Sequence, residues 1–184
     1  MTEALLIVDY TNDFIAPDGA LTVGAPGQAL LPRIQELADD FVDRDQFVFF
    51  PTDKHFKGDH YHPESKLYPP HNLAGTSGRE LYGSLSPWLT AHQDDPRVRF
   101  FDKFRYSAFV GTPLDLWLRE RNIDTVHLAG VCTDICVLHT AIGAVNHGYQ
   151  LVVHKDAVAS FNPEGHKWAL DHMAKVLNAT IVPE

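Results

Sequence analysis

Short apolar runs alternate along this chain with segments whose apolar residues recur at helical spacing. The first run, residues 4–8, is continuously apolar, which is typical of a strand covered on both faces of a parallel sheet. Further short runs of strand character follow at intervals along the whole sequence. The strands that we predict from them cover residues 4–8, 46–50, 98–101, 125–129, 151–154 and 180–182.

Between the apolar runs, hydrophobic residues recur every three or four positions, which indicates amphipathic helices. Thr112 and Pro113 suit the N-cap and the first position of one helix. Gly148 suits the position just after the end of another. The helices that we predict cover residues 28–43, 113–121, 134–147 and 163–177.

This alternation of strands and helices predicts an α/β fold. We expect a doubly wound, mainly parallel six-stranded sheet with helices on both faces and right-handed crossovers. A length of 184 residues is that of one domain, spanning residues 1–184. The irregular segment at about 51–80, rich in His, Pro, Gly, Tyr and charge, is too long for a simple connection and indicates a functional insertion.

Composition narrows the function classes. With 45% hydrophobic residues, 21% charged residues and a net charge of −9, the chain is an unsuitable partner for nucleic acids or anionic membrane surfaces. No apolar run approaches the roughly 18 residues of a membrane span, and the first residues lack the basic segment of a secretory signal. The two cysteines, Cys132 and Cys136, would close only a very short loop. We therefore expect a cytoplasmic protein with reduced thiols and leave homo-oligomerisation open.

Polar side chains follow three of the predicted strands directly. Asp9 comes after the first strand, Lys103 after the third, and Cys136 in the first helical turn after the fourth. In open α/β sheets these strand ends share one edge, where ligands bind. The start of a helix favours a thiolate. In nucleophilic catalysis by cysteine, a carboxylate can take the thiol proton and an ammonium can stabilise the thiolate.

A metal site is expected at the end of the second predicted strand. Asp53 and His55 share one face of extended chain, since side chains alternate with period two, and His71 lies later in the same loop. Carboxylate and imidazole ligands suit zinc, iron or manganese. Further candidate ligands in the loop are Glu64, His62 and His60.

Cys132 precedes the candidate nucleophile by four residues, a spacing that suits neither a structural zinc site nor a Cys-x-x-Cys redox pair. We expect it in the tight turn between strand and helix, where its backbone N–H and that of Cys136 form an oxyanion hole. His127 and His154 lie inside predicted strands, and we interpret them as core or edge residues.

Taken together, these segments resemble the isochorismatase-like cysteine hydrolases and, within them, the nicotinamidases or pyrazinamidases. The resemblance covers essentially the whole chain. The segments that carry it are Val8-Asp9 with Asn12-Asp13-Phe14, Asp53-x-His55 with residues 71–78, residues 103–109, and residues 130–137.

The resemblance implies a catalytic triad of Asp9, Lys103 and Cys136. It also implies a cis peptide bond between Val131 and Cys132, and it places both of these residues against the substrate. The family's aromatic walls around the substrate ring correspond to Phe14, Tyr68 and Tyr106. The implied cofactor is one divalent metal, zinc before iron or manganese, and its protein ligands are Asp53, His55, His71 and a variable fourth ligand, for which Glu64 is favoured over His62.

The implied activity is metal-dependent hydrolysis of a small amide, nicotinamide, to nicotinate and ammonia through a thioester, as in NAD salvage. Pyrazinamide is an expected second substrate. Two alternatives remain at this point. Another amidohydrolase or isochorismatase-type enzyme on the same fold would keep its activity after metal removal. A non-catalytic metal- or ligand-binding protein would have a Cys136 thiol that alkylates no faster than free cysteine.

Overall fold

The computed structural model describes residues 2–183 and contains one six-stranded sheet in which every neighbouring pair of strands is parallel. The strand order is β3-β2-β1-β4-β5-β6. This architecture confirms the predicted doubly wound α/β fold. The strands are β1 (Glu3–Val8), β2 (Phe47–Asp53), β3 (Val98–Lys103), β4 (Thr125–Val131), β5 (Gln150–Ala159) and β6 (Thr180–Val182).

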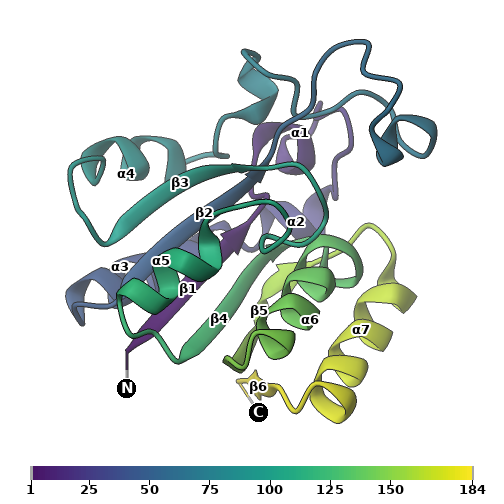
Figure 1. The fold of residues 1–184 in the computed structure, drawn as a ribbon. Coiled ribbons are helices and arrows are strands. Elements are labelled where there is room, and N and C mark those ends of the chain that lie inside the picture. The colour runs from purple at the N-terminus through teal and green to yellow at the C-terminus, as the bar shows by residue number, and fades with distance from the viewer. Residues whose placement is uncertain (1, 184) are drawn as a thin grey trace.

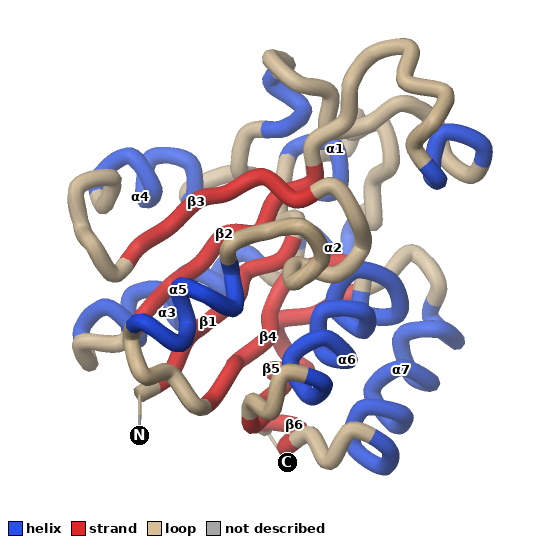
Figure 2. The backbone as a smooth tube through the Cα atoms, in the orientation of Figure 1, coloured by secondary structure: helices blue, strands red, loops and turns tan. Residues whose placement is uncertain are grey.

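Helices cover both faces of the sheet (Figures 1 and 2). Buried side chains of α5, α6 and α7 belong to one hydrophobic cluster, and those of α1, α3 and α4 belong to the other. The helices are α1 (Asn12–Ile15), α2 (Ala25–Gln28), α3 (Leu31–Asp43), α4 (Leu85–Ala91), α5 (Leu114–Glu120), α6 (Leu138–Asn146) and α7 (Pro163–Val176).

Strand β1 shows why a continuous apolar run is needed at the centre of the sheet. Leu6 and Val8 pack in the cluster with α5, α6 and α7, whereas Leu5 and Ile7 pack on the opposite face with α3. All four side chains are fully buried. Because successive side chains alternate between two covered faces, a polar residue would be unfavourable on either face of this strand.

The strand order reverses between β1 and β4, which lie side by side at the centre of the sheet. Loops that leave these two strands at their carboxyl ends run to opposite sides, so a crevice forms between them. The long connection between β2 and β3 extends beyond the same end of the sheet (Figure 1). The topology therefore places the ends of β1 and β4 and the predicted metal loop next to one another.

Strands β2 and β3 are longer than the sequence pattern indicated, as are β4 and β5. Strand β2 continues to Asp53 and β3 to Lys103, and these two residues are paired in the sheet register. The predicted ends at 50 and 101 were wrong because the last residues of both strands are polar and broke the apolar pattern. The segment 51–80, which we call the metal loop, therefore begins inside β2, and the backbone hydrogen bonds of this strand hold the first residues of the segment.

Helix boundaries also differ from the prediction. The predicted helix 28–43 begins only at Leu31, as α3, and a separate helix that was not predicted, α2, precedes it. The segment 134–147 begins with a π-helical turn, Thr133–Val137, and only then continues as α6. Helices α1 and α4 were not predicted, since four and seven residues are too few for a hydrophobic period to stand out.

Among the residues that the structure describes, no helix combines the length and the apolar character needed to cross a membrane.

Candidate active site

Three strand ends bring Asp9, Lys103 and Cys136 together, as the sequence predicted. The ammonium nitrogen Nζ of Lys103 lies 2.7 Å from Oδ2 of Asp9 and 3.5 Å from the Sγ of Cys136. A carboxylate oxygen of Asp9 and the sulfur lie within 4.8 Å of each other. The thiol therefore has a proton acceptor and a cation beside it.

Asp53 belongs to the same cluster, a contact that the sequence did not reveal. Its Oδ1 lies 2.5 Å from Nζ of Lys103, and its backbone N–H donates to Oδ1 of Asp9 at 2.7 Å. The side chain of Lys103 is completely buried between these two carboxylates. Asp53 thereby joins the nucleophile cluster to the metal loop.

Burial and charge shift the pKa values of this cluster. Burial, followed by the negative charge of Asp53, raises the pKa of Asp9 to about 6 despite the neighbouring ammonium. Burial opposes a charged Lys103, but the carboxylates of Asp53 and Asp9 outweigh it and raise its pKa well above the usual value. Each shift follows from placing one cation between two anions away from water.

Burial also raises the pKa of the Cys136 thiol well above its usual value, and Lys103 offsets this only in part. The sequence analysis considered the helix end, which favours a thiolate, and did not anticipate the burial of the sulfur, which opposes one. A thiol with a raised pKa holds its proton more tightly, so attack by this sulfur needs a neighbouring base.

The turn that carries the nucleophile is built on a close approach between β4 and β1. Gly130 has a φ of 105°, and a Cβ at this position would lie 2.1 Å from the carbonyl oxygen of Val8. The peptide bond between Val131 and Cys132 is cis, as the family resemblance implied. The carbonyl oxygen of Cys132 accepts N–H groups from Ile135 and Val137, which closes the π-helical turn around Cys136.

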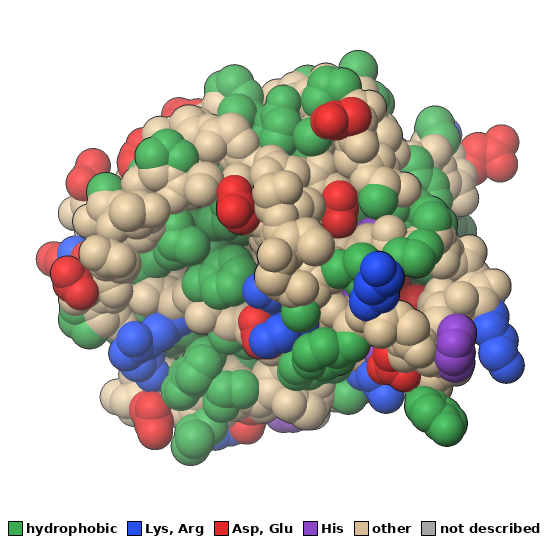
Figure 3. Space-filling view, turned by 90° about the horizontal axis from the view of Figure 1, so that it is seen from above, with side chains coloured by type: hydrophobic (Ala, Val, Ile, Leu, Met, Phe, Trp, Pro, Cys, Tyr) green, Lys and Arg blue, Asp and Glu red, His purple; other side chains and the backbone are tan. Residues whose placement is uncertain are grey.

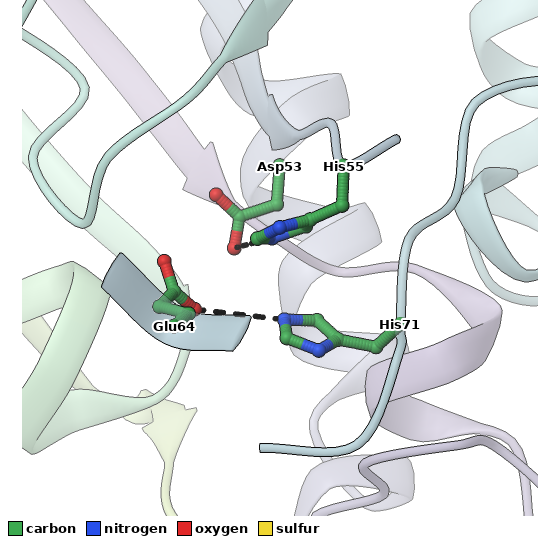
Figure 4. A group of neighbouring side chains, drawn as sticks. All are labelled: Asp53, His55, Glu64 and His71. Atoms are coloured by element: carbon green, nitrogen blue, oxygen red, sulfur yellow. Dashed lines mark ion pairs between the residues drawn. The ribbon is translucent and has the colours of Figure 1, made fainter. Parts of the chain in front are cut away.

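A second group of side chains can hold a cation. Asp53, His55, Glu64 and His71 each offer a ligand atom, and these atoms lie within 4.8 Å of one another (Figure 4). Oδ2 of Asp53 and Nε2 of both histidines are buried without a hydrogen-bond partner in the described part of the chain. Nδ1 of His71 bonds to the carbonyl oxygen of Pro69 at 2.8 Å, which leaves Nε2 free to bind. A carboxylate oxygen and imidazole nitrogens that are buried without hydrogen-bond partners are suitable ligands for a divalent metal.

The structure favours Glu64 as the fourth member of this group. Glu64 is buried, and its Oε2 lies 3.6 Å from Nε2 of His71. His62 and His60, the other candidates from the sequence, contribute no atom to the group. Both nitrogens of His62 are engaged elsewhere, with the backbone of Glu64 and of Phe104.

A narrow, largely apolar cavity lies between the two groups. Phe14, Tyr68, Tyr106 and Cys132 line it, as expected from the sequence. Val131 is not part of the wall, because its side chain is fully buried in the core. The complete lining is Phe14, Leu21, Asp53, Glu64, Tyr68, Tyr106, Cys132, Ile135, Cys136 and Phe161.

Sequence reasoning missed Leu21, Ile135 and Phe161. A signal existed for Ile135, which is adjacent to Cys136, and for Phe161, which follows the carboxyl end of β5. The predicted end of that strand, at 154, placed Phe161 too far from the edge.

Around this end of the molecule, acidic and basic side chains lie interspersed among hydrophobic ones (Figure 3).

Comparison with known proteins identifies the family. A family model described as "Isochorismatase domain" matches residues 3–182. A nicotinamidase/pyrazinamidase from Bacillus subtilis is similar with a TM-score of 0.96 and 52% identity, over 98% of this chain and 99% of that one. A pyrazinamidase/nicotinamidase from Streptococcus mutans is similar with a TM-score of 0.96 and 53% identity, over 98% of this chain and 100% of that one. A pyrazinamidase from Pyrococcus horikoshii, in complex with zinc, is similar with a TM-score of 0.86 and 29% identity, over 99% of each chain. The chain therefore belongs to the isochorismatase family.

Proposed function

We propose that this protein is a nicotinamidase, which hydrolyses nicotinamide to nicotinate and ammonia and also accepts pyrazinamide. The observation that carries the proposal is the convergence on one cavity of a thiol flanked by a carboxylate and an ammonium with a buried group of metal-ligating side chains. The activities named for the Bacillus, Streptococcus and Pyrococcus proteins support it. Nicotinate formed in this way would enter NAD salvage.

In this proposal Cys136 is the nucleophile. Asp9 accepts the thiol proton, and Lys103, 3.5 Å from the sulfur, stabilises the thiolate. The thiolate attacks the carboxamide carbon, and the backbone N–H groups of Cys132 and Cys136 bind the resulting oxyanion. Asp9 returns its proton to the leaving ammonia as the carbon–nitrogen bond breaks. Water then hydrolyses the thioester, which releases the carboxylic acid and restores the thiol.

Asp53, His55, Glu64 and His71 would hold the divalent metal. When bound there, such an ion offers a Lewis-acid centre for a heteroaromatic nitrogen, and zinc is the first candidate because the Pyrococcus protein contains it. The aromatic side chains at the cavity, among them Phe14, pack against a planar ring and exclude water. Holding the ring in one orientation brings its carboxamide close to the sulfur, which is catalysis by proximity.

Ammonia release from nicotinamide, measured before chelation, after chelation and after metal is added back, tests the proposal. Release that stops on chelation and returns with metal is the expected result. Release that continues after metal analysis shows complete removal would favour another amidohydrolase of the same family. No release with zinc, iron or manganese would contradict the amidase proposal. Zinc that binds without any ammonia release would then favour a binding protein.

A further inference from the structure

His62 joins the loop that carries Glu64 to the segment that follows Lys103. The N–H of Glu64 donates to Nδ1 of His62 at 3.3 Å, and Nε2 of His62 lies 2.8 Å from the carbonyl oxygen of Phe104. The first contact lies within the metal loop, and the second crosses to the end of β3. One imidazole ring therefore spans two segments that are some forty residues apart.

These two partners determine the tautomer of the ring. A backbone N–H can only donate, so Nδ1 of His62 must be the acceptor and carry no proton. A carbonyl oxygen can only accept, so Nε2 must carry the proton that it donates to Phe104. Both nitrogens of the neutral ring are used, and neither is left to bind a metal.

The surroundings of His62 link it to the site from both sides. It is the N-cap of the 3-10 turn Pro63–Lys66, which carries Glu64, and its ring packs edge-on against that of His55 with centroids 4.5 Å apart. Phe104 directly follows Lys103, whose Nζ also donates to the carbonyl oxygen of Arg105 at 3.3 Å. Displacing the ring would loosen a metal-ligating carboxylate and the backbone beside the catalytic lysine together.

We infer that His62 is a positioning residue, which holds Glu64 in the metal group by tying its short turn to the Lys103 segment. The inference rests on the proposed function, since it assigns Glu64 as a ligand. The turn lies in a loop with exposed residues on both sides, such as Tyr61 and Leu67. Without this tie, Glu64 would have to be ordered each time a metal binds, which costs conformational entropy.

Three variants separate the roles of the ring. His62→Phe keeps a ring against His55 and removes both hydrogen bonds. His62→Asn keeps an N-cap acceptor for the N–H of Glu64 but is too short to reach Phe104. His60→Phe is the matched control, because His60 is exposed in the same loop and its side chain makes no hydrogen bond within the described residues.

The measurement is the rate at which a coloured chelator extracts zinc from each purified, zinc-loaded protein. We expect extraction from His62→Phe to be about 10- to 100-fold faster than from wild type, because losing a partner behind a metal ligand typically lowers the metal affinity by such a factor. His62→Asn should fall between the two, and His60→Phe should match wild type. The melting temperatures of the metal-free proteins should stay close together. Excess zinc should restore kcat in His62→Phe.

The outcomes distinguish the inference from the function on which it rests. If His62→Phe loses zinc no faster than His60→Phe, the inference is wrong while the nicotinamidase proposal stands. If wild type holds no zinc and releases no ammonia, both are wrong. An Nδ1-protonated ring of His62 in nitrogen-15 NMR of the wild type would also overturn the inference, because that tautomer cannot accept the N–H of Glu64.

Discussion

Lys103 is the residue on which the chemistry and the stability of the site meet. Its buried ammonium faces the carboxylates of Asp9 and Asp53, and the three charges have no access to water. A buried pair of carboxylates without its cation must take up a proton or separate. The lysine therefore keeps Asp53 ionised for a metal and Asp9 beside the thiol.

Replacing Lys103 by Met, which fills a similar volume, should lower the free energy of unfolding by about 3 kcal/mol, because it leaves two buried carboxylates uncompensated. Urea unfolding of the metal-free protein measures this. Lys54→Met is the control, since Lys54 pairs with Asp102 in a partly exposed ion pair at 2.7 Å whose loss should cost less than about 1 kcal/mol. Equal losses in the two variants would contradict the argument.

The proposed nucleophile is tested by Cys136→Ala. Ammonia release should fall by about 10⁴-fold or more, since no other group can form the thioester. Zinc content should be unchanged, because Cys136 is not in the four-residue metal group. Cys132→Ala, a change to the other thiol on the same cavity wall, should retain measurable activity. Appreciable turnover by Cys136→Ala would remove it from the mechanism.

At the level of elements, the contact between β4 and β1 decides where the nucleophile turn begins. Gly130→Ala should destabilise the protein by more than about 3 kcal/mol, because its Cβ would overlap the backbone of Val8 and cannot be moved aside. Gly148→Ala, after α6, has a similar positive φ of 87° but open space around it, so only backbone strain of about 1–2 kcal/mol applies. Urea midpoints of both variants measure the difference. Similar losses would show that strain, not the close approach, dominates.

Strands β4 and β5 carry a pair of histidines, one half-buried and one buried, on the side of the sheet covered by α3. Nδ1 of His127 lies 3.0 Å from Nε2 of His154, and Phe41 of α3 packs edge-on against His127. Burial, then the neighbouring His127, lowers the pKa of His154 to about 4. Among the charged side chains nearby, Arg33 and Arg44 oppose protonation of His154, and Asp156, which pairs with Arg33, favours it.

This pair predicts a loss of stability in mild acid. The folded-state pKa of His154 lies below its unfolded value of about 6.5, so the stabilisation is complete above pH 6.5 and declines as the pH falls toward 4. At pH 5 the loss should be about 2 kcal/mol. Urea unfolding of metal-free wild type and His154→Asn at pH 7.5 and pH 5 measures it, because the variant has no titrating group at position 154. An identical pH dependence in both proteins would contradict the prediction.

At the scale of the whole molecule, both hydrophobic clusters share one continuous sheet, and the site draws on β1, β2, β3 and β4. We propose that the chain unfolds as a single domain. A ligand that binds only the folded state stabilises it by about 2.7 kcal/mol at a hundred times its dissociation constant. Metal bound at the site should therefore stabilise the entire fold and not only its loop.

Calorimetry should show one transition, which zinc at that excess raises by about 5–10 °C. His71→Ala should unfold with the same single transition but without the shift, because it removes a buried ligand atom of the metal group. Two separate transitions would contradict the single domain. A shift that persists in His71→Ala would place the binding of zinc elsewhere.

The sequence predicted the fold and most of the residues at the site. Asp9 was found because it directly follows an apolar strand, and Cys136 because it lies in the first helical turn after another, and parallel strands end at one edge. The resemblance placed Val131 against the substrate, whereas its side chain is buried in the core and does not line the cavity. The π-helical turn was read as ordinary helix, since its hydrophobic pattern over five residues does not differ from that of an α-helix.

What the sequence by itself determined is the order of strands and helices and the chemical types present at each strand end. These follow from hydrophobic period and chain order, which are local properties. Only the tertiary structure decided that Lys103 binds Asp53, that Glu64 rather than His62 joins the metal group, and that burial raises the pKa of the Cys136 thiol. Each depends on distances and desolvation between residues far apart in the chain, and these arise only when the sheet and its loops are packed together.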